Sequence, residues 1–240
     1  FFFHSGWTSL RFRLREMKLE TGLSLHILAI GFAPFAMQMG MGLLNAVLNR
    51  TLLRYGGATA VAAMGIIYSI LILVMMPLQG LNQGAQPIIG YNYGAKKYAR
   101  VIGTFRLAVT SAVLFVGASF AVIQLFPSVL IGIFGRGDSR LMDLGTRALR
   151  ISTLMFPVVG FQVISANFFQ AVGKPKQGTL LSLSRQLLLL IPLVIVLPRF
   201  FGLYGVFFAM PLADLGSFVL SSIMIAREMR RLGILMHRVR

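Results

Sequence analysis

Long apolar segments separated by short polar turns make up most of the chain. Six of them, within the 240 residues, reach the length of about 20 apolar residues that a helix needs to span the hydrocarbon layer. Such a run must satisfy its backbone hydrogen bonds internally, whereas barrel strands would alternate over about ten residues. The sequence predicts an all-α integral membrane protein with transmembrane helices at roughly 22–48, 58–80, 101–126, 149–172, 179–197 and 202–226.

Glycine and proline mark the turns between these segments. The expected turns lie at residues 54–57, 94–97, 135–138 and 173–176, and Pro198 closes the fifth segment. Three regions follow: a cytoplasmic linker at 1–21, a six-helix transmembrane lobe at 22–226 and a basic cytoplasmic tail at 227–240. Residues 11–20 fit either a short amphipathic helix on the inner membrane surface or a solvated linker.

The composition excludes several classes of protein. Only 12% of the residues are charged and 57% are apolar, which is too little charge to cover a water-soluble fold. The chain has no cysteine, and its three histidines (His4, His26 and His237) are far apart, so we expect neither a metal site nor a cofactor. No paired carboxylates and no Ser/His/Asp arrangement stand out, so we do not expect an enzyme.

The chain carries 23 lysines and arginines against 6 acids, for a net charge of +17. These cations sit at the ends of the apolar segments rather than on one polar face, which argues against nucleic acid as a partner. With six crossings, both termini lie on the same side of the membrane. Most lysines and arginines lie on that side as well. The basic residues on the opposite side are Arg50, Arg54, Arg136, Arg140, Arg147, Arg150 and Arg199. The positive-inside rule makes this majority side cytoplasmic, so we expect a multi-pass protein of the plasma (inner) membrane.

Residues 84–95 (GAQPIIGYNYGA) resemble the eighth helix and following loop of the multidrug and toxic compound extrusion (MATE) family, in its MepA-like branch. Three further stretches are similar to the seventh, tenth and twelfth helices of that family: 31–38 (GFAPFAMQ), 167–175 (NFFQAVGKP) and 211–214 (PLAD). The resemblance covers nearly the whole chain. It implies the second of two six-helix lobes, so that a preceding N-terminal lobe is missing here.

The resemblance also implies a function. Proteins of this family extrude lipophilic, often cationic compounds across the bilayer, in exchange for H+ or Na+, by rocking the two lobes in alternating access. Some branches use acids in the seventh and tenth helices for coupling, but this chain has none at 22–48 or 149–172. In the MepA-like branch, coupling is expected from an acid in the first helix, outside this chain. The alternatives are a lipid-linked polysaccharide flippase of the same superfamily and an inactive fragment of a split transporter gene.

Asp214 is an acid deep inside a predicted span, where a charge costs about 3 kcal/mol and needs a partner or water. At about 1.5 Å per residue, Asp214 lies roughly 18 Å and Arg185 roughly 12 Å from the inner ends of their segments, within reach of an arginine side chain. The pair is either a structural contact between the last two helices or a titrating coupling site.

Other polar side chains inside the spans either line a substrate cavity or hold helices together. These cavity candidates are Gln38, Asn45, Gln83, Gln86, Gln162, Ser165 and Asn167. Frequent methionines could offer varied ligands a flexible apolar surface, or simply fill the core: Met37, Met39, Met41, Met64, Met75 and Met76.

Single cysteines placed near the two ends test the orientation. Because the chain has no cysteine, Ser9→Cys and His237→Cys give unambiguous labels. We expect neither to react with a membrane-impermeant maleimide added outside intact cells, and both to react after the cells are broken. External labelling of either position would contradict the orientation.

Overall fold

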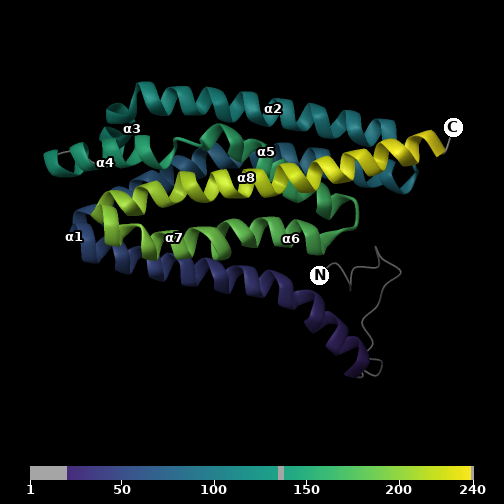
Figure 1. Ribbon diagram of the computed structural model, residues 1–240, viewed down its shortest axis with the longest axis horizontal. Helices are drawn as coiled ribbons and strands as arrows, with labels where there is room; N and C mark the ends of the chain where they lie inside the picture. Colours follow the sequence, from purple (N-terminus) through teal and green to yellow (C-terminus); the bar gives the residue numbers. More distant parts are fainter. Residues whose placement is uncertain (1–20, 135–137, 239–240) are drawn as a thin grey trace, which may run out of the picture. The chain divides into compact units, whose positions relative to one another are not determined.

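The computed structural model describes residues 21–134 and 138–238, so the predicted amphipathic segment at 11–20 lies outside the described residues (Figure 1). The chain divides into two compact units, Phe1–Met39 and Gly40–Arg240, and the packing described below is that of the second. All secondary-structure elements in the described part of the chain are helical, as the apolar pattern predicts.

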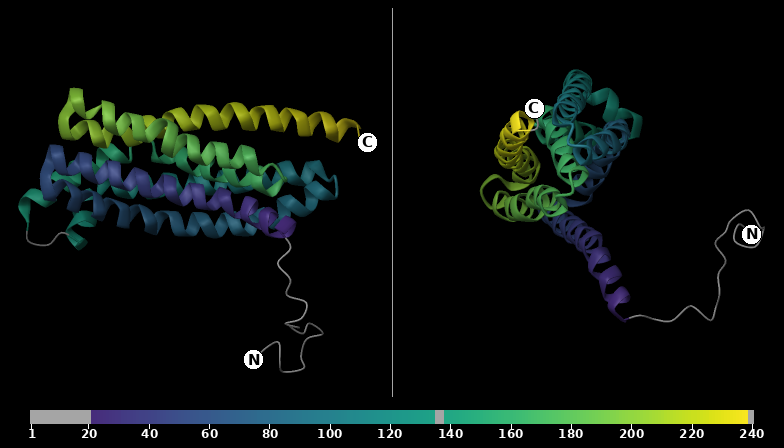
Figure 2. Two further views of the ribbon diagram at one scale, coloured as in Figure 1. Left: turned by 90° about the horizontal axis from the view of Figure 1, so that it is seen from below. Right: turned by 90° about the vertical axis from the view of Figure 1, so that its right-hand side faces the viewer.

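The helix α1 (Thr21–Gly94) is two helices joined at Gly57. Gly57 has φ 66° and ψ −164°, a backbone conformation that residues with a Cβ rarely adopt. In Figures 1 and 2 the second arm, from Ala58, turns back and runs in the direction opposite to residues 40–56. The first two predicted spans therefore lie on the two arms, and the second arm continues as helix to Gly94, beyond the expected end at residue 80.

Lys96, with φ 57°, makes the predicted turn into α2 (Tyr98–Leu125), which covers the third expected span. A short helix, α3 (Pro127–Phe134), follows and was not predicted. Asp138 then caps the next helix, because its carboxylate oxygen accepts hydrogen bonds from the backbone N–H groups of Arg140 (2.9 Å) and Leu141 (3.2 Å).

The fourth expected span, 149–172, is not one straight helix. It is divided between α4 (Ser139–Ser152) and α5 (Phe156–Ala171), which meet at an angle of 54°. Pro157 lacks the N–H that would continue the helix, and the Gln124 side chain of α2 donates hydrogen bonds to the Arg150 carbonyl and the Thr153 hydroxyl at the bend. The sequence prediction treated 149–172 as one apolar span and missed this break, which Pro157 and the polar residues Ser152 and Thr153 mark in the sequence.

The fifth span consists of α6 (Pro175–Leu183), a π-helix η2 (Ser184–Leu190) and α7 (Ile191–Val196). Pro192 follows the π-helix, where its ring would clash with the carbonyl of an ordinary α-helical turn, so the wider turn relieves that contact. The last helix, α8 (Pro198–Arg238), breaks at Gly202 (φ 56°) and then continues through the predicted basic tail.

The core of the second unit surrounds α5, which packs against α2, α6 and α8. The Phe105 and Phe168 rings stack edge to face with centroids 4.8 Å apart, and a Cβ at Gly160 would lie 3.0 Å from the Ala112 backbone. Lipid tails are as apolar as the core, so close packing rather than the hydrophobic effect holds these helices together.

Four helices in the described chain are long and apolar enough to cross a membrane: Gln38–Gly94, Tyr98–Leu125, Pro175–Val196 and Pro198–Leu235. The bent pair α4 and α5 adds a fifth. Since Gln38–Gly94 contains both arms of α1, the six predicted segments each have a helical counterpart. The chain is a multi-pass membrane protein.

Gly205 tests the tight hairpin between α7 and α8. A Cβ there would lie 2.5 Å from the Leu197 backbone, which cannot move without moving the helix. We expect Gly205→Ala to destabilise the lobe by about 1–3 kcal/mol, typical of overpacking, and to lower the thermal midpoint in detergent. Gly65→Ala is the matched control because it meets nothing within 4 Å. Equal midpoints for both variants would contradict the close approach.

Candidate functional site

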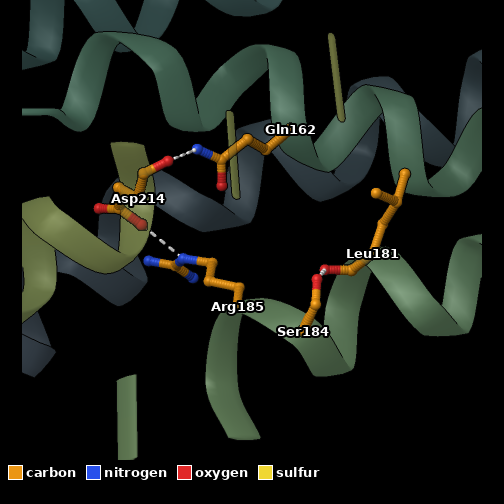
Figure 3. A network of polar contacts seen from close by, with 5 residues as sticks. All are labelled: Gln162, Leu181, Ser184, Arg185 and Asp214. Atoms are coloured by element: carbon orange, nitrogen blue, oxygen red, sulfur yellow. Dashed lines mark hydrogen bonds and ion pairs between the residues drawn. The ribbon is translucent and has the colours of Figure 1, made fainter. Parts of the chain in front are cut away.

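A polar network connects three elements inside the lobe (Figure 3). Arg185 of η2 donates a hydrogen bond through Nε to Asp214 Oδ1 of α8 at 2.5 Å. Gln162 of α5 donates through Nε2 to the Asp214 backbone carbonyl at 2.7 Å. The structure thus pairs the two charges that the sequence analysis placed at similar depths in the membrane. It also adds the Gln162 amide from a third helix, α5.

Local backbone geometry positions these groups. The π-helix changes the register of the residues that follow Leu183, and both Arg185 and Gln186 line the same pocket. Ser184 lies at the start of this segment, and its hydroxyl donates back to the Leu181 carbonyl at 3.0 Å. Asp214 lies three residues beyond Pro211, which is inside α8.

The two charges differ in exposure. The Asp214 side chain is 4% exposed, whereas the Arg185 side chain is 37% exposed. Insertion scales assign about 2.5–3.5 kcal/mol to each isolated charge at the centre of a membrane helix, so each depends on the other. The carboxylate is therefore held behind the guanidinium, and the guanidinium is the group that a ligand can reach.

A cavity of about 440 Å³ opens in front of Arg185. Its walls come from both arms of α1, from α5, from η2 and from α8. The polar wall groups are Asn45, Tyr68, Arg185 and Gln186, and the remainder are apolar: Met41, Leu44, Leu71, Ile72, Met75, Phe156, Leu190, Met210 and Ala213. A volume in the range of about 300–1,000 Å³, with apolar walls and few polar groups, is typical of small-molecule sites.

The predicted cavity residues do not form one group. Asn45 lines this cavity, and Gln162 lies behind it in the Asp214 network. Ser165 and Asn167 donate back to carbonyls of their own helix, at 2.6 Å and 2.9 Å. The other three amides, Gln38, Gln83 and Gln86, are exposed on α1.

The methionines are similarly divided. Met41 and Met75 line the cavity, together with Met210, which the sequence analysis did not select. Met64 is buried in the core, and Met39 and Met76 are exposed. Met37 lies outside the residues whose side chains are described.

Sequence reasoning missed several polar groups. Tyr68 and Gln186 line the cavity, but a single amide or phenol in an apolar segment gives no directional signal. A second ion pair joins the half-buried Lys174, in the turn before α6, to the buried Glu228 on α8. In the sequence, Glu228 is an acid inside a basic stretch, and this is the feature that could have indicated an ion pair.

In the described residues, no group of three or more histidine, aspartate and glutamate side chains could hold a metal ion. The arrangement of an ion pair, a few donors and an apolar cavity suits reversible binding of a small molecule.

Comparisons with known proteins give the family. The family model for MatE matches residues 23–196. The multidrug export protein MepA of Staphylococcus haemolyticus is 25% identical over 206 residues, which are 86% of this chain and 45% of that protein. The chain spans about half the length of the curated relatives it matches.

Solved structures agree on the fold. An inward-facing multidrug resistance MATE transporter superposes with a TM-score of 0.83 at 19% identity, covering 92% of this chain and 51% of that one. The MATE multidrug transporter DinF-BH, in complex with R6G, gives a TM-score of 0.76 at 36% identity, covering 94% and 50%. The fold is thus that of a multi-pass membrane transporter. The chain belongs to the MatE family.

Charge-removal variants test whether the Arg185–Asp214 pair is mainly structural. Removing one partner of a buried pair typically costs about 3–5 kcal/mol, whereas replacing both with apolar residues is often nearly neutral. We expect Asp214→Asn or Arg185→Leu alone to lower the yield of folded protein and its thermal midpoint in detergent. The double variant Asp214→Leu with Arg185→Leu should recover most of both.

The exposed pair Arg147–Asp143 is the control, because Asp143→Asn should leave the midpoint unchanged. A stable double variant that confers no drug resistance in the two-lobe protein would make Asp214 a coupling group. Single variants as stable as the parent would contradict the structural role.

Proposed function

We propose that this chain is half of a cation-coupled secondary multidrug exporter, which extrudes lipophilic, often cationic compounds by alternating access. The observation that carries the proposal is the match of nearly the whole chain to about half of a solved MATE transporter, 92% of the chain against 51% of the structure. The mostly apolar cavity inside the lobe, with its few polar groups, is consistent with a protein that binds small molecules.

An exposed row of amides supports a second lobe as partner. Gln79, Gln83 and Gln86 are exposed on the second arm of α1, at spacings that place them on one face of the helix. Amides facing lipid tails would lose their hydrogen bonds with water at a cost of several kcal/mol each. A six-helix N-terminal lobe, or a wet cavity between two lobes, is the cover that this face requires.

Coupling to H+ or Na+ is part of the same proposal. Asp214 already has the Arg185 guanidinium as its counter-ion. A carboxylate with a fixed internal cation gains little from binding another cation. We therefore assign the acid that couples transport to H+ or Na+ to the partner lobe. In this proposal, the lobe described here has a structural and ligand-binding role.

The flippase alternative requires a cavity with several cations for a pyrophosphate. Arg185 lines the cavity, but Arg106 lies exposed on α2 and is not among the wall residues. A single guanidinium supports the exporter better than the flippase. The proposed location is the plasma (inner) membrane, with both termini in the cytoplasm, the linker at 1–21 and the basic tail at 227–240.

Dye efflux tests the two-lobe requirement. In a host without its own exporters, cells that express this chain alone should retain a fluorescent lipophilic cation like the empty-vector control, because the transport path lies between lobes. Co-expression with a six-helix N-terminal lobe should restore energy-dependent efflux. Efflux by the single chain would overturn the two-lobe proposal, and no efflux from the pair would support the inactive-fragment alternative.

A further inference from the structure

The cavity in front of Arg185 presents a positive group to whatever enters it. Among the described residues that form its walls, Arg185 is the charged one, and the others are apolar or neutral. The Asp214 carboxylate is not part of the wall and is 4% exposed. The ion pair therefore turns its positive end toward the cavity and its negative end into the helix packing.

Arg185 also retains donors for a ligand. Its hydrogen bond to Asp214 uses Nε. Within the part of the chain that the structure describes, the two terminal nitrogens form no hydrogen bond with another side chain. A guanidinium edge with two such nitrogens matches the two oxygens of a carboxylate, and its attraction for an anion is strengthened by the low dielectric of the site.

The neutral wall groups fit the same ligand. Asn45 and Gln186 can each donate through an amide N–H, and Tyr68 can donate through its hydroxyl. The apolar walls, which include Leu71, Ile72 and Met75, would hold a hydrophobic body of moderate size within about 440 Å³. A lipophilic cation would instead meet the guanidinium at short range and be repelled.

We infer that this cavity is a binding site for a lipophilic molecule that carries one anionic or strongly accepting group, held by Arg185. The inference concerns the single lobe and goes beyond the proposed function, which places lipophilic cations in the path between two lobes. This pocket therefore prefers anions, whereas the path between the two lobes is proposed to carry cations.

Binding of a matched pair of probes tests the inference. Pyrenebutanoate and pyrenebutyltrimethylammonium share an apolar body and differ in the sign of the charged end. With the protein in nanodiscs of neutral lipid, fluorescence anisotropy gives the dissociation constant of each probe after subtraction of binding to empty nanodiscs. We expect pyrenebutanoate to bind at least tenfold more tightly. Equal binding, or tighter binding of the cation, would overturn the inference.

Three variants test whether Arg185 causes the preference for pyrenebutanoate. The double variant Arg185→Leu with Asp214→Leu removes the charged pair together and should abolish the tenfold preference, while Arg185→Lys should retain most of it. Arg106→Leu removes an exposed cation of α2 that is not part of the wall and should leave the preference unchanged. Preference that persists in the double variant, or that is lost in Arg106→Leu, would place the site elsewhere and contradict the inference.

The anionic group that Arg185 binds could belong to a membrane lipid or to a free lipophilic anion. Increasing amounts of phosphatidylglycerol in the nanodiscs distinguish these two sources. Competition with pyrenebutanoate identifies a membrane lipid headgroup as the occupant, and lack of competition identifies an exogenous lipophilic anion. The assay needs no ion gradient and no transport. An absence of efflux would therefore count against the exporter alone, and an absence of anion preference against this pocket alone.

Discussion

Inside the lobe, the Arg185 guanidinium and the Asp214 carboxylate are solvated by each other rather than by bulk water. An isolated charge there costs several kcal/mol, so the elements that carry the two charges must meet. The π-helix η2, the last helix α8 and the Gln162 amide of α5 are all arranged around this contact. The cavity follows from it, because the carboxylate is sealed and the guanidinium is left at the wall.

The sequence predicts the membrane-embedded helical class well, because lipid imposes a length and an apolar composition that no soluble core requires. Gly57 and Gly173 marked turns correctly, since both adopt a positive φ. The α4–α5 bend was missed although Pro157 marks it in the sequence, and hydropathy gave no sign of the π-helix or of the cavity wall. In a membrane protein, lipid-facing and core-facing positions are both apolar, so hydropathy does not show which face of a helix is covered.

The polar side chains illustrate this limit. Gln83 and Gln162 look alike in sequence, yet one is exposed and the other donates to a carbonyl of α8. Asp214 and Arg185 could be paired from depth alone because both are rare ionisable groups in apolar segments. The domain boundaries and the roles of the site residues stay predictions.

Two ion pairs join the fifth span and the turn before it to the sixth span. Lys174 pairs with Glu228, and Arg185 pairs with Asp214, and both acids belong to α8. During synthesis the fifth segment leaves the ribosome before the sixth, so Lys174 and Arg185 are made before their counter-ions. The contacts that neutralise Lys174 and Arg185 are therefore completed only after α8 has been synthesised, which makes the docking of α8 a late step in the assembly of the lobe.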